Sequence, residues 1–228
     1  MIRGQLCLGF ALGAILLAGC QTAPSNFATA NEQTLPETAF ATSALLSSTS
    51  MPEGTPTESA PPGFVSFCYR FADQCAASPN DATVVHLDAA SQAVLNRVNY
   101  SVNRAIVPED DQRHYDRAEY WDIPADGFGN DKDYALTKRR DLINAGLSER
   151  ALRIAIVITR QNARHAVLTV VTDRGDIVLD NLTNEIKPWD QAGYQWIARQ
   201  DSGGELGWVT LAGGTRDFAL IRTGLAER

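Results

Sequence analysis

Two polar side chains interrupt the apolar runs in the second half of the chain. His165 begins the run HAVLTVVT, and Asp180 lies near the end of DIVLDN. Runs this rich in valine and isoleucine, separated by the turn residues Asp173 to Gly175, predict adjacent antiparallel strands. A carboxylate that meets an imidazole orients it and stabilises its protonated form. His165 and Asp180 are therefore candidates for the base half of a Cys-His-Asp or Ser-His-Asp hydrolase.

The register of the two strands decides whether these side chains meet. A turn with Arg174 and Gly175 as its central residues puts both on one face of the sheet but about four residues apart along the strands. Contact then requires a bulge or a shifted turn. The alternative is that a histidine at a strand start and an aspartate at a strand end are ordinary edge residues with satisfied hydrogen bonds. The strand pattern alone leaves both interpretations open.

The stretch GFGNDKDYALTKRR, residues 127 to 140, predicts a glycine-rich turn that leads into a helix ending near Gly146. The first turn of a helix has unpaired N–H groups and the positive end of the dipole, which stabilise a capping carboxylate, an anion or a thiolate. We expect Asp131 to be a capping carboxylate. Arg139 and Arg140 are expected on a solvated face of this helix.

The hydrophobic pattern of the remaining chain predicts an α+β fold. Valine, leucine and isoleucine recur at helical spacing between Asp88 and Ile106, which predicts an amphipathic helix packed on a core. Strands are expected over 153–159, 165–172 and 176–181, and two more in YQWIARQ and LGWVTLA. Because helices come first and strands follow, we expect an antiparallel sheet packed on a central helix.

Residues 1–19 have the layout of a secretory signal rather than a membrane span, with Arg3 ahead of a short apolar core. The sequence LAGC at 17–20 resembles a bacterial lipobox, which implies cleavage before Cys20 and lipidation of its thiol. The alternative is an ordinary signal peptide followed by a chance cysteine. A lipidated chain would be anchored to a membrane and face the periplasm, and Gln21 after the cysteine favours the outer membrane.

The rest of the chain divides by composition. Residues 20–62 are rich in serine, threonine, alanine and proline, so they bury too little apolar surface to offset chain entropy and are expected to be a flexible tether. Residues 63–211 are long enough for one folded domain, and 212–228 form a C-terminal tail. The net charge is −7, and no basic run interleaves with aromatic residues. Nucleic acid is therefore not expected as a partner.

Cys68 and Cys75 lie within the expected domain, seven positions apart. In the periplasm disulfides persist, so we expect the two to pair. The alternative is that one of them is a free nucleophile, which requires an environment that lowers the pKa of the thiol. Arg70 is the only cation next to them in the sequence.

Six stretches agree in order and spacing with a known protein family. They are GFVSFCYRFADQC, RVNYSVNRAI, GNDKDYALTKRRDLINAGL, HAVLTVVTDRGDIVLDN, KPW and GYQWIARQ. Together they resemble the bacterial transglutaminase-like cysteine peptidases, in particular the proteobacterial branch once filed as a domain of unknown function. The resemblance spans most of the chain from Pro61 to Leu211 and implies a papain- or transglutaminase-like α+β fold.

In that family the central helix begins with Gly-Asp-Cys-Glu-Asp-Tyr, and its cysteine is the nucleophile. Residues 129–134 read GNDKDY here. The resemblance therefore implies that Asp131 occupies the nucleophile position, whereas His165 and Asp180 remain as the catalytic histidine and aspartate. Family members also bind calcium through acidic residues that flank the cysteine. Those positions hold Asn130 and Lys132, and because an ammonium repels a hard cation, no metal or other cofactor is expected.

The missing cysteine predicts a lipid-anchored periplasmic protein that does not cut and that holds a peptide or protein partner of the cell envelope in the old cleft. One alternative is an active peptidase or acyl transferase of the same fold with an atypical nucleophile, although a carboxylate attacks amides poorly. Another alternative is a purely structural envelope lipoprotein, for which the tether and the anchor matter more than the cleft.

Overall fold

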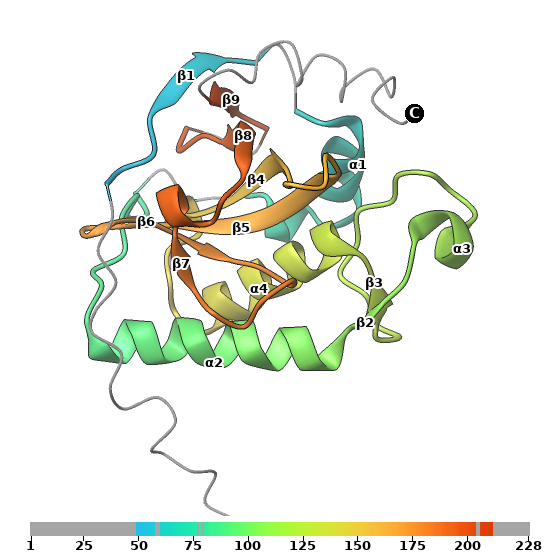
Figure 1. Cartoon of the computed structure of the whole chain (residues 1–228), viewed down its shortest axis with the longest axis horizontal. Helices are drawn as coiled ribbons and strands as arrows, with labels where there is room; N and C mark the ends of the chain where they lie inside the picture. Colours follow the sequence, from blue (N-terminus) through green and yellow to red (C-terminus); the bar gives the residue numbers. More distant parts are fainter. Residues whose placement is uncertain (1–48, 58–59, 77, 79, 204–205, 212–228) are drawn as a thin grey trace, which may run out of the picture. The chain divides into compact units, whose positions relative to one another are not determined.

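The α-helices of the described chain lie before residue 145, and most strands of the antiparallel sheet come after residue 151 (Figure 1). The computed structural model describes residues 49–57, 60–76, 78, 80–203 and 206–211. The helices are α1 (Pro62–Arg70), α2 (Ala89–Ala105), α3 (Asp111–Tyr115) and α4 (Asp131–Asn144), with short 3₁₀ turns η2 (Ala72–Gln74), η3 (Glu149–Ala151) and η4 (Trp189–Gln191). The strands are β1 (Glu53–Pro56), β2 (Val107–Pro108), β3 (Phe128–Gly129), β4 (Leu152–Ile158), β5 (Arg164–Thr172), β6 (Gly175–Leu179), β7 (Lys187–Pro188), β8 (Gln195–Gln200) and β9 (Trp208–Leu211). This order of elements is the predicted α+β architecture.

The main sheet of the described residues has the strand order β1-β9-β8-β4-β5-β6-β7, and neighbouring strands are antiparallel. α4 contacts β4 and β5 as well as α2, and it lies between the sheet and α2 (Figure 1). All residues from Lys132 to Arg139 are buried. α4 is therefore the central helix on which the sheet packs, as the sequence predicted.

Both ends of α4 have defined caps. Asn130 is the N-cap residue, and its backbone N–H donates to the Asp133 carboxylate at 3.0 Å. Beyond the other end, Gly146 adopts a φ of +92°, a left-handed conformation that glycine reaches without steric penalty. The following N–H, of Leu147, donates to the Leu142 carbonyl at 3.0 Å, which is the Schellman arrangement. The predicted helix end near Gly146 is confirmed.

The prediction of a solvated face at Arg139 is wrong. Its side chain is buried, and its guanidinium donates to the carbonyls of Leu152 and Gln74 and to the Glu149 carboxylate. A buried arginine is tolerated when its donors meet acceptors of this kind. Because α4 is enclosed by the sheet and α2, it buries positions that helical spacing alone assigns to solvent.

The predicted tether over 20–62 extends too far towards the C-terminus. β1 pairs with β9, and the Glu53 carboxylate lies 2.6 Å from Arg153 and 2.8 Å from Arg199. Met51 is buried as well. The last part of this stretch therefore belongs to the folded unit. Composition does not reveal this, because the stretch is held by backbone hydrogen bonds to a sheet edge and by ion pairs with arginines that are distant in sequence.

The predicted disulfide between Cys68 and Cys75 is present, with Cα atoms 5.7 Å apart. It joins the last turn of α1 to the residue that follows η2. Cys75 is also buried in the core. Neither sulfur is a free thiol while this bond is intact, so these two cysteines supply no nucleophile.

Several predictions concern residues that lie outside the described part of the chain. They are the signal peptide over 1–19, the lipidated Cys20 and the tail over 212–228. Within the described part, none of the helices combines the length and the apolar character that crossing a membrane would require.

Candidate functional site

The pairing of β5 with β6 brings His165 and Asp180 together. Thr172 pairs with Gly175, so the turn starts one residue earlier than predicted. Continued past the end of β6, this register places Asp180 opposite Val167, on the diagonal from His165, where side chains are within reach of each other. His165 Nε2 and Asp180 Oδ1 are 2.9 Å apart. The shifted turn that contact required is therefore present.

Asp131 completes the cluster from the start of α4. Its Oδ2 lies 3.2 Å from His165 Nδ1 and also accepts the backbone N–H of Ala166 at 2.8 Å. Its Oδ1 accepts the N–H of Lys132 at 2.9 Å. The prediction that Asp131 is a capping carboxylate is therefore only partly right: the N-cap residue is Asn130, and one oxygen of Asp131 bonds to β5 instead.

The imidazole lies between two carboxylates and carries their compensating charge. Burial alone would lower the pKa of His165, but the hydrogen bonds and negative charges of Asp131 and Asp180 outweigh it and raise this pKa to about 9. Burial likewise opposes ionisation of both aspartates, and the hydrogen bond and positive charge of His165 reverse it, so their pKa values lie below the usual range. The cluster is a carboxylate, an imidazolium and a carboxylate at neutral pH.

Three hydrogen-bond donors hold Asp180 in place. The Tyr194 hydroxyl donates to its Oδ2, and the Leu182 N–H donates to its Oδ1 at 3.0 Å. Asn103 of α2 donates its side-chain amide to the Asp180 carbonyl at 2.9 Å. Neither Tyr194 nor Asn103 was identified from the sequence, because no local pattern connects them to a residue so distant along the chain.

Lys138 is a further ionisable group near the cluster. It follows Asp131 by two turns of α4 and is 1% exposed. Burial lowers the pKa of its ammonium to about 7, although the negative charge of Asp180 opposes the shift. The ammonium of Lys138 therefore loses its proton more readily than that of an exposed lysine.

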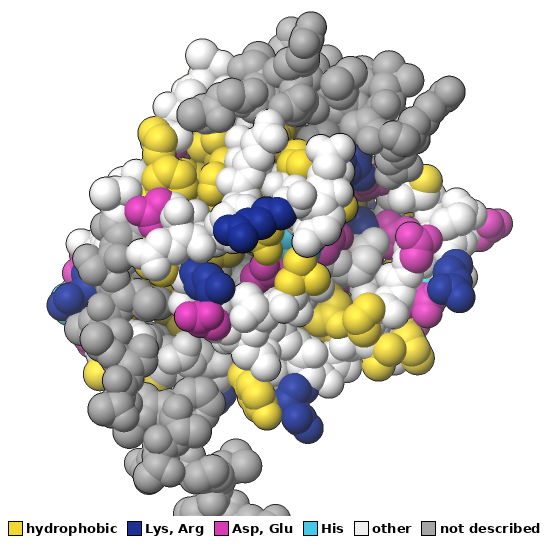
Figure 2. All heavy atoms as spheres, viewed as in Figure 1, with side chains coloured by type: hydrophobic (Ala, Val, Ile, Leu, Met, Phe, Trp, Pro, Cys, Tyr) yellow, Lys and Arg dark blue, Asp and Glu magenta, His cyan; other side chains and the backbone are white. Residues whose placement is uncertain are grey.

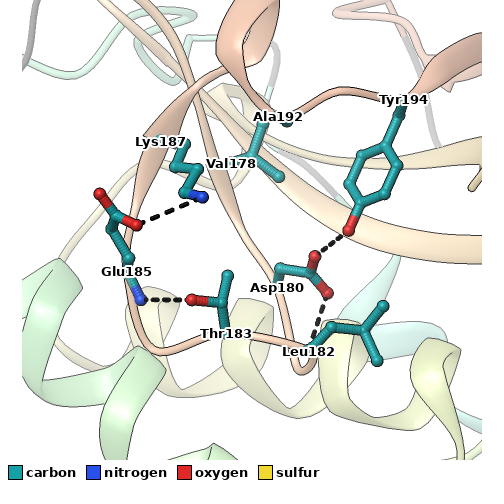
Figure 3. A pocket seen from close by; sticks show the side chains of 8 residues that line it. All are labelled: Val178, Asp180, Leu182, Thr183, Glu185, Lys187, Ala192 and Tyr194. Atoms are coloured by element: carbon teal, nitrogen blue, oxygen red, sulfur yellow. Dashed lines mark hydrogen bonds and ion pairs between the residues drawn. The ribbon is translucent and has the colours of Figure 1, made fainter. Parts of the chain in front are cut away.

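A pocket of about 180 Å³ opens beside Asp180. Figure 3 shows the side chains around it, which come from β6, β7, the loop that joins them and the segment before β8. They are Val178, Asp180, Leu182, Thr183, Glu185, Lys187, Ala192 and Tyr194. On the face drawn in Figure 2, side chains of both charges are interspersed with hydrophobic ones rather than gathered into a region of one sign.

The calcium ion that the family resemblance implies does not fit the residues at the start of α4. Lys132 Nζ lies 2.6 Å from Asp111 Oδ2 and 2.6 Å from Asn130 Oδ1. An ammonium is therefore bonded to the oxygens that a hard cation would need. Among the residues that the structure describes, no group of three or more histidine, cysteine, aspartate or glutamate side chains is arranged to hold a metal.

His165 on β5 and Asp180, which follows β6, lie next to the first turn of the buried central helix α4. A model of the family described as bacterial transglutaminase-like cysteine proteinase, BTLCP, matches residues 54–216. The chain therefore belongs to the bacterial transglutaminase-like cysteine proteinase family, and its fold is transglutaminase-like.

Solved structures of Legionella pneumophila LapG are similar to this chain. The calcium-bound form shares 23% sequence identity, with 53% of this chain and 68% of LapG covered and a TM-score of 0.45. The EGTA-treated form shares 22% identity, with 60% of this chain and 78% of LapG covered and the same TM-score. A search of the curated proteins found no match.

The raised pKa of His165 predicts how the site responds to pH. Because the pKa in the folded chain, about 9, exceeds the unfolded value of 6.5, the pairing contributes its full stabilisation below pH 6.5 and loses it as the pH rises through 9. We expect ¹⁵N NMR to show a protonated His165 ring at pH 7.5. Asp131→Asn should lower its pKa by about one unit or more.

The same variant isolates the contribution of the pair to stability. The difference in free energy of unfolding between the wild type and Asp131→Asn should be largest between pH 3.8 and pH 6.5. It should shrink towards pH 9, where His165 loses its proton, and in acid, where Asp131 gains one. A neutral His165 at pH 7.5, or a stability difference that does not change with pH, would contradict the assignment of charges.

Proposed function

We propose that this protein is a non-catalytic, lipid-anchored periplasmic member of its family and that it holds an extended peptide or a protein partner of the cell envelope at the site around His165. The position of Asp131 is the observation that carries this proposal. Its carboxylate lies at the start of the central helix, bonded to His165 Nδ1 and to the Ala166 N–H. We infer that this is the place of the family's nucleophilic thiolate.

A carboxylate at this place disables amide hydrolysis in two ways. It is a poor nucleophile towards an amide carbon. It also keeps a proton on His165, because the imidazole pKa of about 9 means that the ring is already charged at neutral pH and cannot act as a general base. Cys68 and Cys75 are joined to each other and provide no substitute thiolate. These features favour binding without cleavage over an active hydrolase with an atypical nucleophile.

The pocket beside Asp180 supports a role in binding a peptide side chain. Val178 and Ala192 give it apolar walls, and Leu182 is 65% exposed among the lining residues. Asp180, Glu185 and Lys187 add charged groups to this lining. Pockets that combine apolar walls with placed polar groups are typical of binding sites. We propose that one apolar side chain of an extended partner enters this pocket while the partner's backbone lies beside His165.

Restoring the thiol tests the assignment of the nucleophile position. In Asp131→Cys, the helix dipole and the His165 imidazolium should stabilise a thiolate. We expect iodoacetamide to label residue 131 about tenfold faster at pH 6 than a cysteine introduced at the exposed Arg113, measured by mass spectrometry of the labelled peptides. Adding His165→Ala should remove most of this difference.

The absence of catalysis is tested on the unaltered chain. A mixture of extended peptides incubated with the wild type should show no new termini by mass spectrometry. Turnover by the wild type that is abolished in His165→Ala would overturn the proposal, as would an Asp131→Cys thiol no more reactive than the control.

Peptide binding is tested with a phage-displayed library of random linear peptides. Peptides enriched on the wild type should bind Leu182→Asp on the order of tenfold more weakly in fluorescence anisotropy, because a charge beside the pocket opposes entry of an apolar group. Val84→Asp, at a position that is 42% exposed and does not line the pocket, is the matched control and should bind normally. No enrichment, or equal loss in both variants, would reject the pocket.

The membrane anchor rests on LAGC at 17–20 and on Gln21. The wild type should fractionate with the outer membrane and incorporate radiolabelled palmitate. Cys20→Ser should lose the label and leave the outer-membrane fraction, because it lacks the thiol that carries the lipid. Recovery of the wild type in the soluble periplasm would contradict the anchor. It would not bear on peptide binding, which the phage-display experiment tests separately.

A further inference from the structure

A buried ammonium lies between α3 and the start of α4. Lys132 Nζ is 2.6 Å from Asp111 Oδ2 and 2.6 Å from Asn130 Oδ1. The side chains of Lys132 and Asp111 are 7% and 3% exposed. Two oppositely charged groups this deeply buried interact more strongly than a pair on the surface, and removal of either leaves the other without compensation.

The Asp111 carboxylate uses its remaining capacity to hold neighbouring chain. It accepts the backbone N–H of Tyr120 at 2.6 Å and the side-chain amide of Asn130 at 2.8 Å. Burial raises the pKa of Asp111, although the hydrogen bond and charge of Lys132 act in the opposite direction. The ammonium therefore supports a carboxylate that burial disfavours.

A second carboxylate lies within the field of the same ammonium. Asp133 accepts the N–H of Asp122 at 2.9 Å and the N–H of Asn130 at 3.0 Å. Burial raises its pKa to about 7, and the positive charge of Lys132 is the largest opposing influence. Asp111 and Asp133 together fasten residues 120–122 to the start of α4, and one positive charge serves both.

The Asp111 carboxylate and the Asn130 amide oxygen contact the Lys132 ammonium, and Asp133 lies in its field. Oxygen donors of this kind hold a divalent cation in other proteins. Here the positive charge that a bound cation would supply comes from the Lys132 ammonium. We propose that Lys132 is a built-in cation that fastens the segment from Asp111 to Asp122 onto α4 and makes the folded site independent of divalent metal ions. This inference does not depend on whether the site cuts or only binds.

Thermal unfolding of the purified full-length chain tests the inference. The melting temperature of the wild type should be the same in calcium chloride and in EDTA. Lys132→Met should lower it by on the order of 10 °C, because two buried carboxylates lose their shared counter-charge. The matched control is Arg113→Met on α3. Arg113 also pairs with a carboxylate, that of Glu109, but its side chain is 80% exposed. Its melting temperature should stay close to that of the wild type.

Charge reversal gives the complementary result. Lys132→Glu should be destabilised in EDTA and should regain several degrees in calcium chloride, because a third carboxylate then joins Asp111 and Asp133. Calcium binding to the wild type in isothermal titration calorimetry would overturn the inference, and this measurement needs no variant. The inference would also be overturned if Lys132→Met melted at the wild-type temperature, or if the melting temperature of Lys132→Glu were the same in calcium chloride and in EDTA. None of these readouts depends on peptide binding.

Discussion

The line of Asp131, His165 and Asp180 is the interaction on which the site depends. A single imidazolium lies 3.2 Å from one carboxylate and 2.9 Å from the other, and the side chains of His165 and Asp180 are 6% and 4% exposed. Burial of ionised groups is tolerated only when each meets an opposite charge and completes its hydrogen bonds. The charge on His165 therefore sets the relative positions of α4, β5 and the segment after β6. Under the proposed function, the same charge keeps His165 from acting as a general base.

α4 supplies positive charges to acidic groups from several other elements. Lys132 meets Asp111 of α3, and Arg139 meets Glu149 of η3. Lys138 lies in the field of Asp180 beyond β6. The central helix is therefore joined to its surroundings by compensated charges as well as by apolar contacts. This arrangement explains how a helix with the polar sequence DKDYALTKRRDLIN occupies a buried position between the sheet and α2.

The sequence predicted the fold because apolar periods define the helices and strands. It singled out His165 and Asp180 as polar residues within apolar runs, but the pattern alone left open whether they meet. It did not predict their contact, which depends on a turn that starts one residue earlier. Tyr194 and Asn103 were missed because they reach Asp180 from distant elements. Arg139 was assigned to solvent because helical spacing does not reveal that a helix is enclosed by neighbours on several sides.

Neutron diffraction from crystals of the wild type at pH 7 would locate the protons of the cluster. Deuterium is expected on both Nδ1 and Nε2 of His165 and on neither carboxylate of Asp131 and Asp180. A bare Nδ1 within reach of a protonated Asp131, or an Asp131 side chain turned away from the imidazole, would leave His165 free to act as a base and would show that the charges are assigned wrongly.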